Sequence, residues 1–324
     1  MASQTLSRIH LSKSLTPLAS RALSTSIENA ISTSKSSSGN PKLTYYSAWF
    51  CPFAHRTTLA LERHKGHVTY EWVEALGWEK RAKTKEEIAT KHENWYHFKH
   101  PDLMKHNPLG MVPTIVDGSQ NVITESITAI EYVDEIVGGG DHAIMANEAH
   151  ERANERVWAG VMAKTACSKY YGVLVRQTES EQLEAFGEIE ASLEKFATML
   201  PGEDDDGSKR KGSGAGPFFM GRDHPGLVDL TLFPWAWRFP VFETYRDERF
   251  KIDPTKSKGM LKYSNWLAAM CARDDVARTL PIWDEYLDHI GRYADGSARS
   301  KVANAVRDGR EAHQYDDEKD DVKD

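Results

Sequence analysis

Three consecutive glycines at 138–140 divide the chain into two parts with different secondary-structure patterns. Before them, strand patterns and helix patterns alternate along the sequence. After them, apolar residues recur at the helical spacing of about 3.6, with almost no strand-like alternation. Because a glycine run is a strong break in regular structure, we predict an α/β domain over residues 41–137 and an all-helical domain over residues 147–296.

The α/β part opens with a strand, a helix and a second strand. Residues 42–48 (KLTYYSA) and 68–73 (VTYEWV) have strand patterns. The helix between them is expected to begin at Pro52, because a proline at the first helical position loses no hydrogen bond. It is expected to end near Lys65, before Gly66. A strand–helix–strand unit is a crossover between parallel strands.

A hairpin and a further helix complete the predicted α/β part. Residues 114–116 and 121–124 flank Asp117-Gly118, which is a turn signal between two strands. Residues 125–137 then carry apolar side chains at helical spacing. The predicted order is therefore strand, helix, strand, an irregular stretch, a hairpin and a helix.

Two polar stretches interrupt these patterns. Residues 76–106 form a long connection with a helical pattern over residues 86–98. Residues 201–216 (PGEDDDGSKRKGSGAG) are a low-complexity insertion, expected to be a flexible loop. The helices of the second part are expected near residues 147–178, 180–199, 227–242, 257–272 and 282–293.

Charge is distributed unevenly, and the two ends differ most from the rest. Residues 1–26 contain seven serines, three basic residues and no acidic residue, which is typical of a mitochondrial or plastid transit peptide. A plain disordered tail is the alternative. We therefore expect residues 1–40 to be a leader, and the protein to be mitochondrial or otherwise cytoplasmic. At the other end, eight acidic against three basic side chains over residues 308–324 favour a disordered acidic tail, placed over residues 297–324.

The composition excludes several classes of protein. A net charge of -7, from 41 basic and 48 acidic side chains, argues against a nucleic-acid-binding protein. The most apolar stretch, residues 227–242, is interrupted by charges and prolines, so no membrane span is expected. Three cysteines in 324 residues are too few for a disulfide scaffold and indicate a reducing compartment. The thirteen histidines complete no recognisable ligand set, so we expect no metal site.

Cys51 carries the strongest chemical indication in the chain. It directly precedes the first predicted helix, where backbone N–H groups and the helix dipole favour a thiolate and are expected to lower the pKa. Ala54 stands where a dithiol enzyme has its second cysteine, so the site would be monothiol and would need an external thiol. A buried structural cysteine is an equal alternative on these residues alone. Cys167 and Cys271 lie in apolar helical patterns and are expected to be structural.

Two further positions are candidates for binding a ligand with an extended backbone. If the bond between Val112 and Pro113 is cis, Val112 can present its backbone N–H and C=O to such a ligand. A trans proline in an edge loop is the alternative. Glu125 and Ser126 stand at a predicted helix start, where N–H groups and a hydroxyl can bind a carboxylate. Simple capping by Thr124 explains the same residues.

Four segments, taken in order, resemble the glutathione transferase family and specifically its omega-like, cysteine-type members. They are YSAWFCPFAHR (46–56), NPLGMVPTI (107–115), ESITAIEYVDE (125–135) and FFMGRDHPGLVDLTLFPWAWR (218–238). The resemblance covers about residues 42–296. It implies a thioredoxin-like N-terminal domain, an all-α C-terminal domain, glutathione as co-substrate and a homodimer.

The resemblance also implies roles for particular residues. Cys51 would form a mixed disulfide with glutathione. Lys99 is the nearest match to a lysine that contacts glutathione in the family, although its spacing differs by one residue and Lys105 competes with it. The full set of implied glutathione-binding residues is Phe53, Lys99, Val112, Pro113, Glu125 and Ser126.

The chain departs from the family pattern at three places. The insertion over residues 201–216 is extra to that pattern. Residues 76–106 are longer than the family's usual connection. Gly226 stands three residues before Asp229, where the family usually has a serine or threonine, so the helix capping box there is expected to be weak.

The function implied is a glutathione-dependent thiol transferase that removes glutathione from proteins or reduces dehydroascorbate. A glutathionyl-hydroquinone reductase is an alternative, although its motif usually has tryptophan in place of Phe53. A non-enzymatic chloride-channel-like protein is the third hypothesis. The charged residues of the first predicted helix argue against the membrane insertion that it would require.

Overall fold

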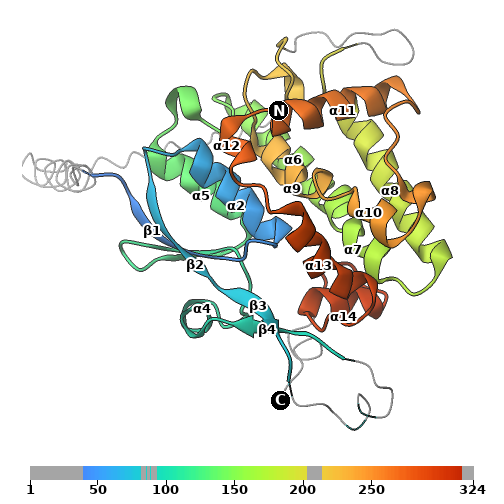
Figure 1. The fold of residues 1–324 in the computed structure, drawn as a ribbon. Coiled ribbons are helices and arrows are strands. Elements are labelled where there is room, and N and C mark those ends of the chain that lie inside the picture. The colour runs from blue at the N-terminus through green and yellow to red at the C-terminus, as the bar shows by residue number, and fades with distance from the viewer. Residues whose placement is uncertain (1–38, 82–84, 86–87, 89–92, 203–213, 316–324) are drawn as a thin grey trace, which may run out of the picture. The chain divides into compact units, whose positions relative to one another are not determined.

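The computed structural model of the protein describes residues 39–81, 85, 88, 93–202 and 214–315. From Pro41 onward the described residues belong to one compact unit (Figure 1). The predicted leader, the predicted transit peptide and most of the insertion over residues 201–216 lie outside the described residues.

The predicted strand–helix–strand unit is confirmed. Strands β1 (Lys42–Ser47) and β2 (Thr69–Glu74) pair in parallel, and helix α2 (Pro52–Arg63) connects them. Tyr45 of β1 is fully buried, and its hydroxyl donates a hydrogen bond of 2.6 Å to the backbone oxygen of Ala54. This bond joins the strand to the first turn of α2 and thereby positions the residues between them.

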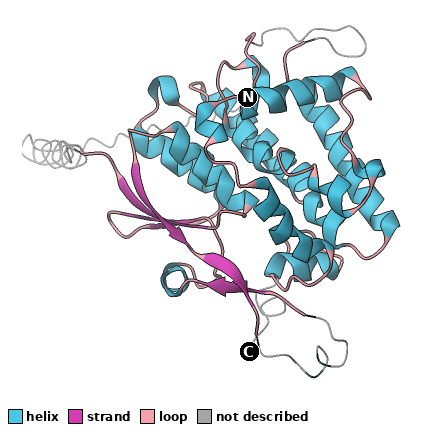
Figure 2. Cartoon of the chain, in the orientation of Figure 1, coloured by secondary structure: helices cyan, strands magenta, loops and turns pink. Residues whose placement is uncertain are grey.

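The predicted hairpin and the helix after it are also confirmed. β5 (Thr114–Asp117) pairs antiparallel with β1, and β6 (Val122–Ile123) pairs antiparallel with β5. The four strands form one sheet in the order β2–β1–β5–β6. Figure 2 draws the strands in magenta and the helices in cyan. The Asp117 carboxylate accepts hydrogen bonds from the backbone N–H groups of Ser119 and Asn121, which closes the turn. With helix α5 (Ser126–Val137) after the hairpin, this part is thioredoxin-like.

The connection over residues 76–106 differs from its prediction. β3 (Leu76–Glu79) and β4 (Tyr96–Lys99) form a separate antiparallel pair, so the expected helical pattern is wrong for residues 96–98. Most of the earlier part of that pattern lies outside the described residues. Trp78 of β3 faces His97 of β4, with ring centroids 4.3 Å apart. Such cross-strand aromatic pairs stabilise a strand pair, and this one joins residues far apart in the sequence.

The elements after the glycine run are helical, as predicted. They begin with the turn η1 (Gly140–His142) and continue through α6 (Ala149–Met162), the π-helical turn η2 (Ala163–Cys167), α7 (Lys169–Val175), α8 (Glu179–Ala197), the turn η3 (Phe219–Gly221), α9 (Leu227–Ala236), α10 (Val241–Tyr245), the turn η4 (Glu248–Phe250), α11 (Lys258–Cys271), α12 (Asp274–Ala277), α13 (Trp283–Ala294) and α14 (Lys301–Arg307). A further short helix, α4 (Pro101–His106), precedes β5. The predicted helical segments correspond to α6 through α11 and to α13. Helices α12 and α14 were not predicted.

The prediction of a disordered tail is wrong for residues 297–315. They contain α14, whose first turn is capped by Ser300, because its hydroxyl accepts a hydrogen bond from the N–H of Ala303 at 3.1 Å. Backbone hydrogen bonds link Trp95, next to β4, with Ser297 and with Arg299. The stretch has buried valines and alanines, and most of the acidic residues come after it, in a segment outside the described residues.

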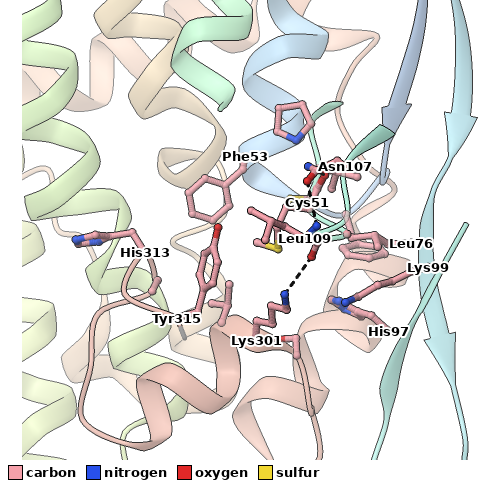
Figure 3. Close-up of a pocket in the computed structure, with 18 of the residues that line it drawn as sticks. Cys51, Phe53, Leu76, His97, Lys99, Asn107, Leu109, Lys301, His313 and Tyr315 are labelled. Atoms are coloured by element: carbon pink, nitrogen blue, oxygen red, sulfur yellow. Dashed lines mark hydrogen bonds between the residues drawn. The ribbon is translucent and has the colours of Figure 1, made fainter. Parts of the chain in front are cut away.

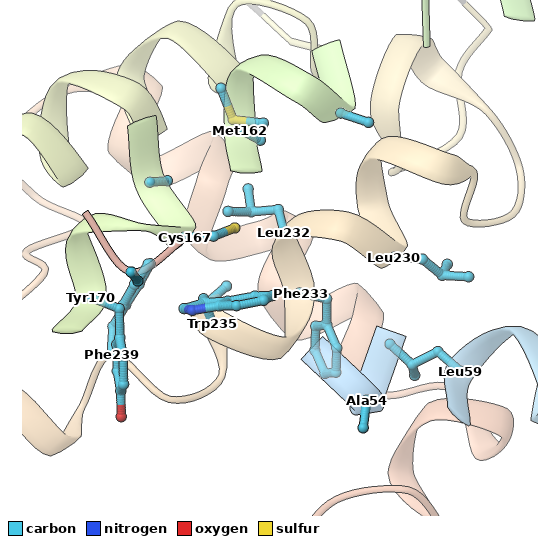
Figure 4. Packing of buried hydrophobic residues seen from close by; sticks show 14 of the residues in the cluster. Ala54, Leu59, Met162, Cys167, Tyr170, Leu230, Leu232, Phe233, Trp235 and Phe239 are labelled. Atoms are coloured by element: carbon cyan, nitrogen blue, oxygen red, sulfur yellow. The ribbon is translucent and has the colours of Figure 1, made fainter. Parts of the chain in front are cut away.

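Helix α9 lies at the centre of the packing. All its residues are buried, and it packs against both α2 and α6. Figure 4 shows the side chains of α9, among them Leu230, Phe233 and Trp235, in the same cluster as Ala54 and Leu59 of α2. The apolar core therefore continues from the thioredoxin-like part into the helical part.

The capping box of α9 is half present, as the glycine at its start predicted. Asp229 accepts three hydrogen bonds, from the N–H of Gly226 at 2.8 Å, the N–H of Phe219 at 3.0 Å and the indole N–H of Trp266 at 2.8 Å. A Cβ on Gly226 would meet the guanidinium end of Arg222. A larger residue at this position would therefore require the Arg222 side chain to move.

Among the described residues, no helix has both the length and the apolar character that crossing a bilayer requires.

Candidate active site

A cavity of about 220 Å³ lies between the thioredoxin-like part and the C-terminal helices (Figure 3). Figure 3 shows Cys51 near the middle, with Phe53 and Tyr315 on one side and Leu76 and Lys99 on the other. The structure brings every residue of the predicted site to this cavity, whose walls include Cys51, Phe53, Lys99, Val112, Pro113, Glu125 and Ser126.

Cys51 is the residue immediately before α2. Its backbone N–H is hydrogen-bonded to the oxygen of Ala48 at 3.0 Å, and its side chain makes no capping bond. The side chain is half-buried, and burial raises the pKa of the Cys51 thiol. The N–H groups of Ala54 and Phe53 act in the opposite direction, as do the guanidinium groups of Arg238 and Arg56. The expected lowering of this pKa is therefore wrong, because the sequence showed the helix start but not the burial.

The direction of this shift predicts how Cys51 reacts as the pH changes. Thiolate is the reactive form, so alkylation of Cys51 by iodoacetamide in the glutathione-free protein should accelerate with rising pH. The half-maximal rate should lie above the free thiol value of about 8.5. Mass spectrometry of the Cys51 peptide after timed alkylation measures this rate. A half-maximal rate below neutral pH would show that the helix start outweighs burial.

Val112 and Pro113 form the loop before β5, and the bond between them is cis. The loop is held by Asn107, whose amide group donates to the backbone oxygen of Met111 at 3.1 Å and to the hydroxyl of Thr114 at 3.0 Å. Val112 is buried, yet neither its N–H nor its C=O is hydrogen-bonded to another described residue. Buried backbone groups are nearly always paired, so this pair is available to the backbone of a ligand.

Glu125 and Ser126 start α5, but not as simple capping predicts. The residue at the cap position is Glu125 and not Thr124, and Glu125 makes no side-chain capping bond. Its φ of 67° is uncommon for a residue other than glycine. The hydroxyl oxygen of Ser126 accepts a hydrogen bond of 3.0 Å from Nη1 of Arg56. The hydroxyl hydrogen of Ser126 is therefore left to donate to a ligand.

Arg56 is a site residue whose role the sequence analysis missed. It is 2% exposed, donates from Nε to the backbone oxygen of Thr231 at 2.9 Å, and stacks on Trp235 at 4.3 Å from the ring centroid. Its place in the segment YSAWFCPFAHR was visible, but its partners lie far away in the sequence. The guanidinium group brings positive charge to the side of the cavity where Ser126 lies.

The structure distinguishes the two candidate lysines. Lys99 lies on β4 and lines the cavity, and its stem passes over Gly110, where an added Cβ would be 2.5 Å from Cδ of Lys99. Lys105 is exposed and paired with Asp102 at 2.5 Å, and it is not among the residues that line the cavity. Lys99 is therefore the one placed to contact a ligand.

Two histidines of the cavity wall, His97 and His289, are poor bases. Burial lowers the pKa of His97 to about 3 and lowers that of His289 well below its usual value. His289 stacks on Phe50 with ring centroids 3.8 Å apart and accepts a hydrogen bond from the Trp78 indole at its Nδ1 atom. Both rings are therefore neutral near pH 7 and contribute shape to the cavity.

The C-terminal residues provide a further wall that the sequence analysis missed. Lys301 is buried and donates from Nζ to the backbone oxygen of Leu109 at 3.1 Å (Figure 3). The apolar pattern of α14 was the signal that could have identified this segment as folded. Its cavity-lining members are Arg299, Ser300, Lys301, Val302, Ala312, His313 and Tyr315.

The other two cysteines lie away from the cavity. Cys167 is buried in the apolar core, and neither it nor Cys271 lines the cavity. Among the described residues, no cluster of three or more histidine, cysteine or acidic side chains is placed to hold a metal ion. The cavity therefore presents a single thiol, that of Cys51.

Comparison with known proteins agrees with this geometry. Residues 50–136 match the family model of the glutathione S-transferase N-terminal domain. Glutathione transferase GST 23 of Zea mays is 28% identical over 240 residues, which are 74% of this chain and 89% of that protein. Glutathione S-transferase omega-1 of Mus musculus is 27% identical over 248 residues, which are 75% of this chain and 83% of that protein. These matches show a glutathione S-transferase N-terminal domain over residues 50–136 and similarity to glutathione transferases over about three quarters of the chain.

Solved structures of glutathione transferases show that this chain has their fold. The rice transferase GST1 in complex with glutathione has a TM-score of 0.59 at 20% identity and covers 80% of this chain and 99% of its own. Glutathione transferase Omega 3C of Trametes versicolor has a TM-score of 0.57 at 19% identity and covers 78% of this chain and 91% of its own. The predicted architecture, a thioredoxin-like domain followed by helices, is confirmed.

Proposed function

We propose that this protein is a glutathione transferase, specifically an omega-like thiol transferase that works through a mixed disulfide between glutathione and Cys51. The observation that supports this most directly is that one cavity contains both a thiol and an unpaired stretch of backbone. The thiol of Cys51 lies at the start of α2, and the unpaired backbone of Val112 lies on the same cavity wall. Glutathione has both a sulfur atom and a peptide backbone, and the rice transferase of the same fold was solved with it bound.

The proposed reaction balances with glutathione as the reductant. The Cys51 thiolate attacks the glutathionyl sulfur of a mixed disulfide, the substrate's S–S bond breaks, and the other sulfur leaves with the electron pair. A second glutathione thiolate then attacks the Cys51–glutathione disulfide. Glutathione disulfide forms, and Cys51 returns as a thiolate. Glutathionylated proteins are the first substrate class, and dehydroascorbate is the second.

Glutathione would be held by the residues around the thiol. Its cysteinyl backbone would pair with the N–H and C=O of Val112, next to the cis-Pro113. Its γ-glutamyl end would lie at the start of α5, with the carboxylate on Ser126 and the amino group on the Glu125 carboxylate. Lys99 and Phe53 would contact the rest of the tripeptide. We also propose a homodimer, which sedimentation of the purified protein tests.

Replacing Ser126 by alanine tests the proposed carboxylate contact. Loss of a hydrogen bond to a charged group costs about 1.5–3 kcal/mol, so glutathione affinity should fall by roughly tenfold or more. The free protein should also lose stability, because Nη1 of the buried Arg56 loses its acceptor. Calorimetric titration with glutathione, together with thermal unfolding, measures both effects.

The matched control for this prediction is Ser126→Thr, which keeps the hydroxyl. It should retain most of the affinity and most of the stability. Unchanged glutathione affinity in Ser126→Ala would refute the contact, even if stability fell.

The proposed activity is tested by four assays on the same preparation. The substrates are a glutathionylated peptide, dehydroascorbate, a glutathionyl hydroquinone and a chloro-dinitro aromatic compound. We expect turnover of the first two to exceed conjugation of the aromatic compound, because a cysteine at this position forms a disulfide with glutathione. Preferred turnover of the hydroquinone would instead favour the reductase alternative. Conjugation as the main activity would contradict the proposal.

A further inference from the structure

The hydroxyl group of Tyr171 faces the cavity and makes no hydrogen bond to another described residue. Helices α7 and α13 place four tyrosines together near Cys51. Tyr170 and Tyr286 bond to each other at 2.9 Å, and Tyr293 bonds to the hydroxyl of Ser300 at 3.0 Å. Tyr171 is only 5% exposed and lines the cavity, yet its hydroxyl is bonded to no other described residue. This hydroxyl is not among the buried side-chain atoms that lack a partner, so it is reached from the cavity and can donate to a molecule bound there.

We propose that Tyr171 is a catalytic hydrogen-bond donor for the sulfur atom that departs when Cys51 attacks a disulfide. The proposal rests on the thiol-transferase function proposed above. It adds a residue of the helical part to a reaction whose other proposed groups come from the thioredoxin-like part.

The proposed role requires the Tyr171 hydroxyl to lie on the far side of the attacked sulfur from the Cys51 thiol. A thiolate attacks a disulfide in line with the S–S bond, so the departing sulfur lies on the far side of the attacked sulfur from Cys51. Tyr171 comes from α7 of the helical part and lines the same cavity as Cys51. With glutathione on the side of Val112 and Ser126, the departing sulfur would be directed towards the helical part.

The protonation state of Tyr171 fits a donor. Burial raises the pKa of its hydroxyl well above the usual value, and the neighbouring Tyr293 and Tyr286 and a thiolate at Cys51 raise it further. The hydroxyl therefore keeps its proton beside a thiolate. It stabilises the negative charge on the departing sulfur by a hydrogen bond, and that sulfur takes its proton from water after release.

The inference predicts a dependence on the leaving group. A thiol of low pKa leaves readily without help, whereas an alkyl thiol is a poorer leaving group. Two probes share the glutathionyl half, the mixed disulfides of glutathione with cysteine and with nitrothiobenzoate. For Tyr171→Phe, kcat with the cysteine disulfide should fall roughly tenfold, which corresponds to about 1.4 kcal/mol in the barrier. With the nitrothiobenzoate disulfide, kcat should change little.

Tyr170→Phe is the matched control, because it lies next in the sequence on the same helix but does not line the cavity. It removes the bond to Tyr286, so it should lower stability without changing the ratio of the two rates. Tyr171→Phe should leave stability unchanged or raise it, since its hydroxyl has no bond to lose.

The outcomes separate this inference from the function on which it rests. Equal effects of Tyr171→Phe on both disulfides, or no effect on either, would overturn the role of Tyr171 while leaving thiol transfer by Cys51 intact. Absence of wild-type turnover with both disulfides would instead overturn the proposed function, and the inference with it.

Discussion

Cys51→Ala should abolish thiol transfer and leave the fold unchanged. No second thiol lines the cavity, so nothing replaces the nucleophile. The side chain makes no capping bond to α2, and its removal therefore costs little helix stability. Turnover of a glutathionylated peptide should fall to the uncatalysed rate, and the glutathione adduct should disappear from the mass spectrum. Thermal unfolding should remain close to that of the wild type.

Cys271→Ala provides the control for this experiment. It also removes a half-buried thiol, but one that lies at the end of α11 and away from the cavity. We expect full activity from this variant. Thiol transfer near the wild-type rate in Cys51→Ala would exclude the mixed-disulfide mechanism.

The largest effect on stability is expected from Asp229→Ala. The substitution leaves three buried N–H groups without their acceptor, those of Gly226, Phe219 and the Trp266 indole. Each unsatisfied buried donor costs about 1–3 kcal/mol, so we expect a loss of about 3–5 kcal/mol in the free energy of unfolding. Denaturant unfolding followed by circular dichroism measures the loss.

Two variants serve as references for Asp229→Ala. Asp223→Ala removes an exposed carboxylate and should change stability by less than about 0.5 kcal/mol. Asp229→Asn keeps one acceptor oxygen, so its loss in the free energy of unfolding should lie between those of Asp223→Ala and Asp229→Ala. A loss below about 1 kcal/mol in Asp229→Ala would show that water replaces the carboxylate as acceptor.

The sequence was most informative where structure depends on neighbouring residues. The start of α2 at Pro52, the turn at Asp117 and the start of α5 each follow from a few adjacent side chains, and the structure has all three. Adjacent residues also raised the possibility of a cis bond before Pro113 and of a reactive Cys51. The structure has the cis bond and places Cys51 in the cavity. The site residues that were predicted from local patterns and from the family resemblance all line one cavity.

The features that were missed depend on contacts between distant parts of the chain. The pairing of Trp78 with His97 turned an expected helical pattern into a strand. The bond from Arg56 to Ser126 joins two helices 70 positions apart. The pKa of Cys51 was predicted in the wrong direction for a related reason. A helix start is visible in the sequence, but the burial that raises the pKa depends on the completed fold.

The folded C-terminal segment has a consequence for engineering. Residues 297–315 contribute one wall of the cavity, but they lie beyond the stretch that resembles the family. A shortened chain that ended at residue 296 would keep Cys51, Val112 and Ser126 and would lose that wall. Exchange of the segment alone would therefore alter the outline of the cavity without altering the residues proposed to hold glutathione.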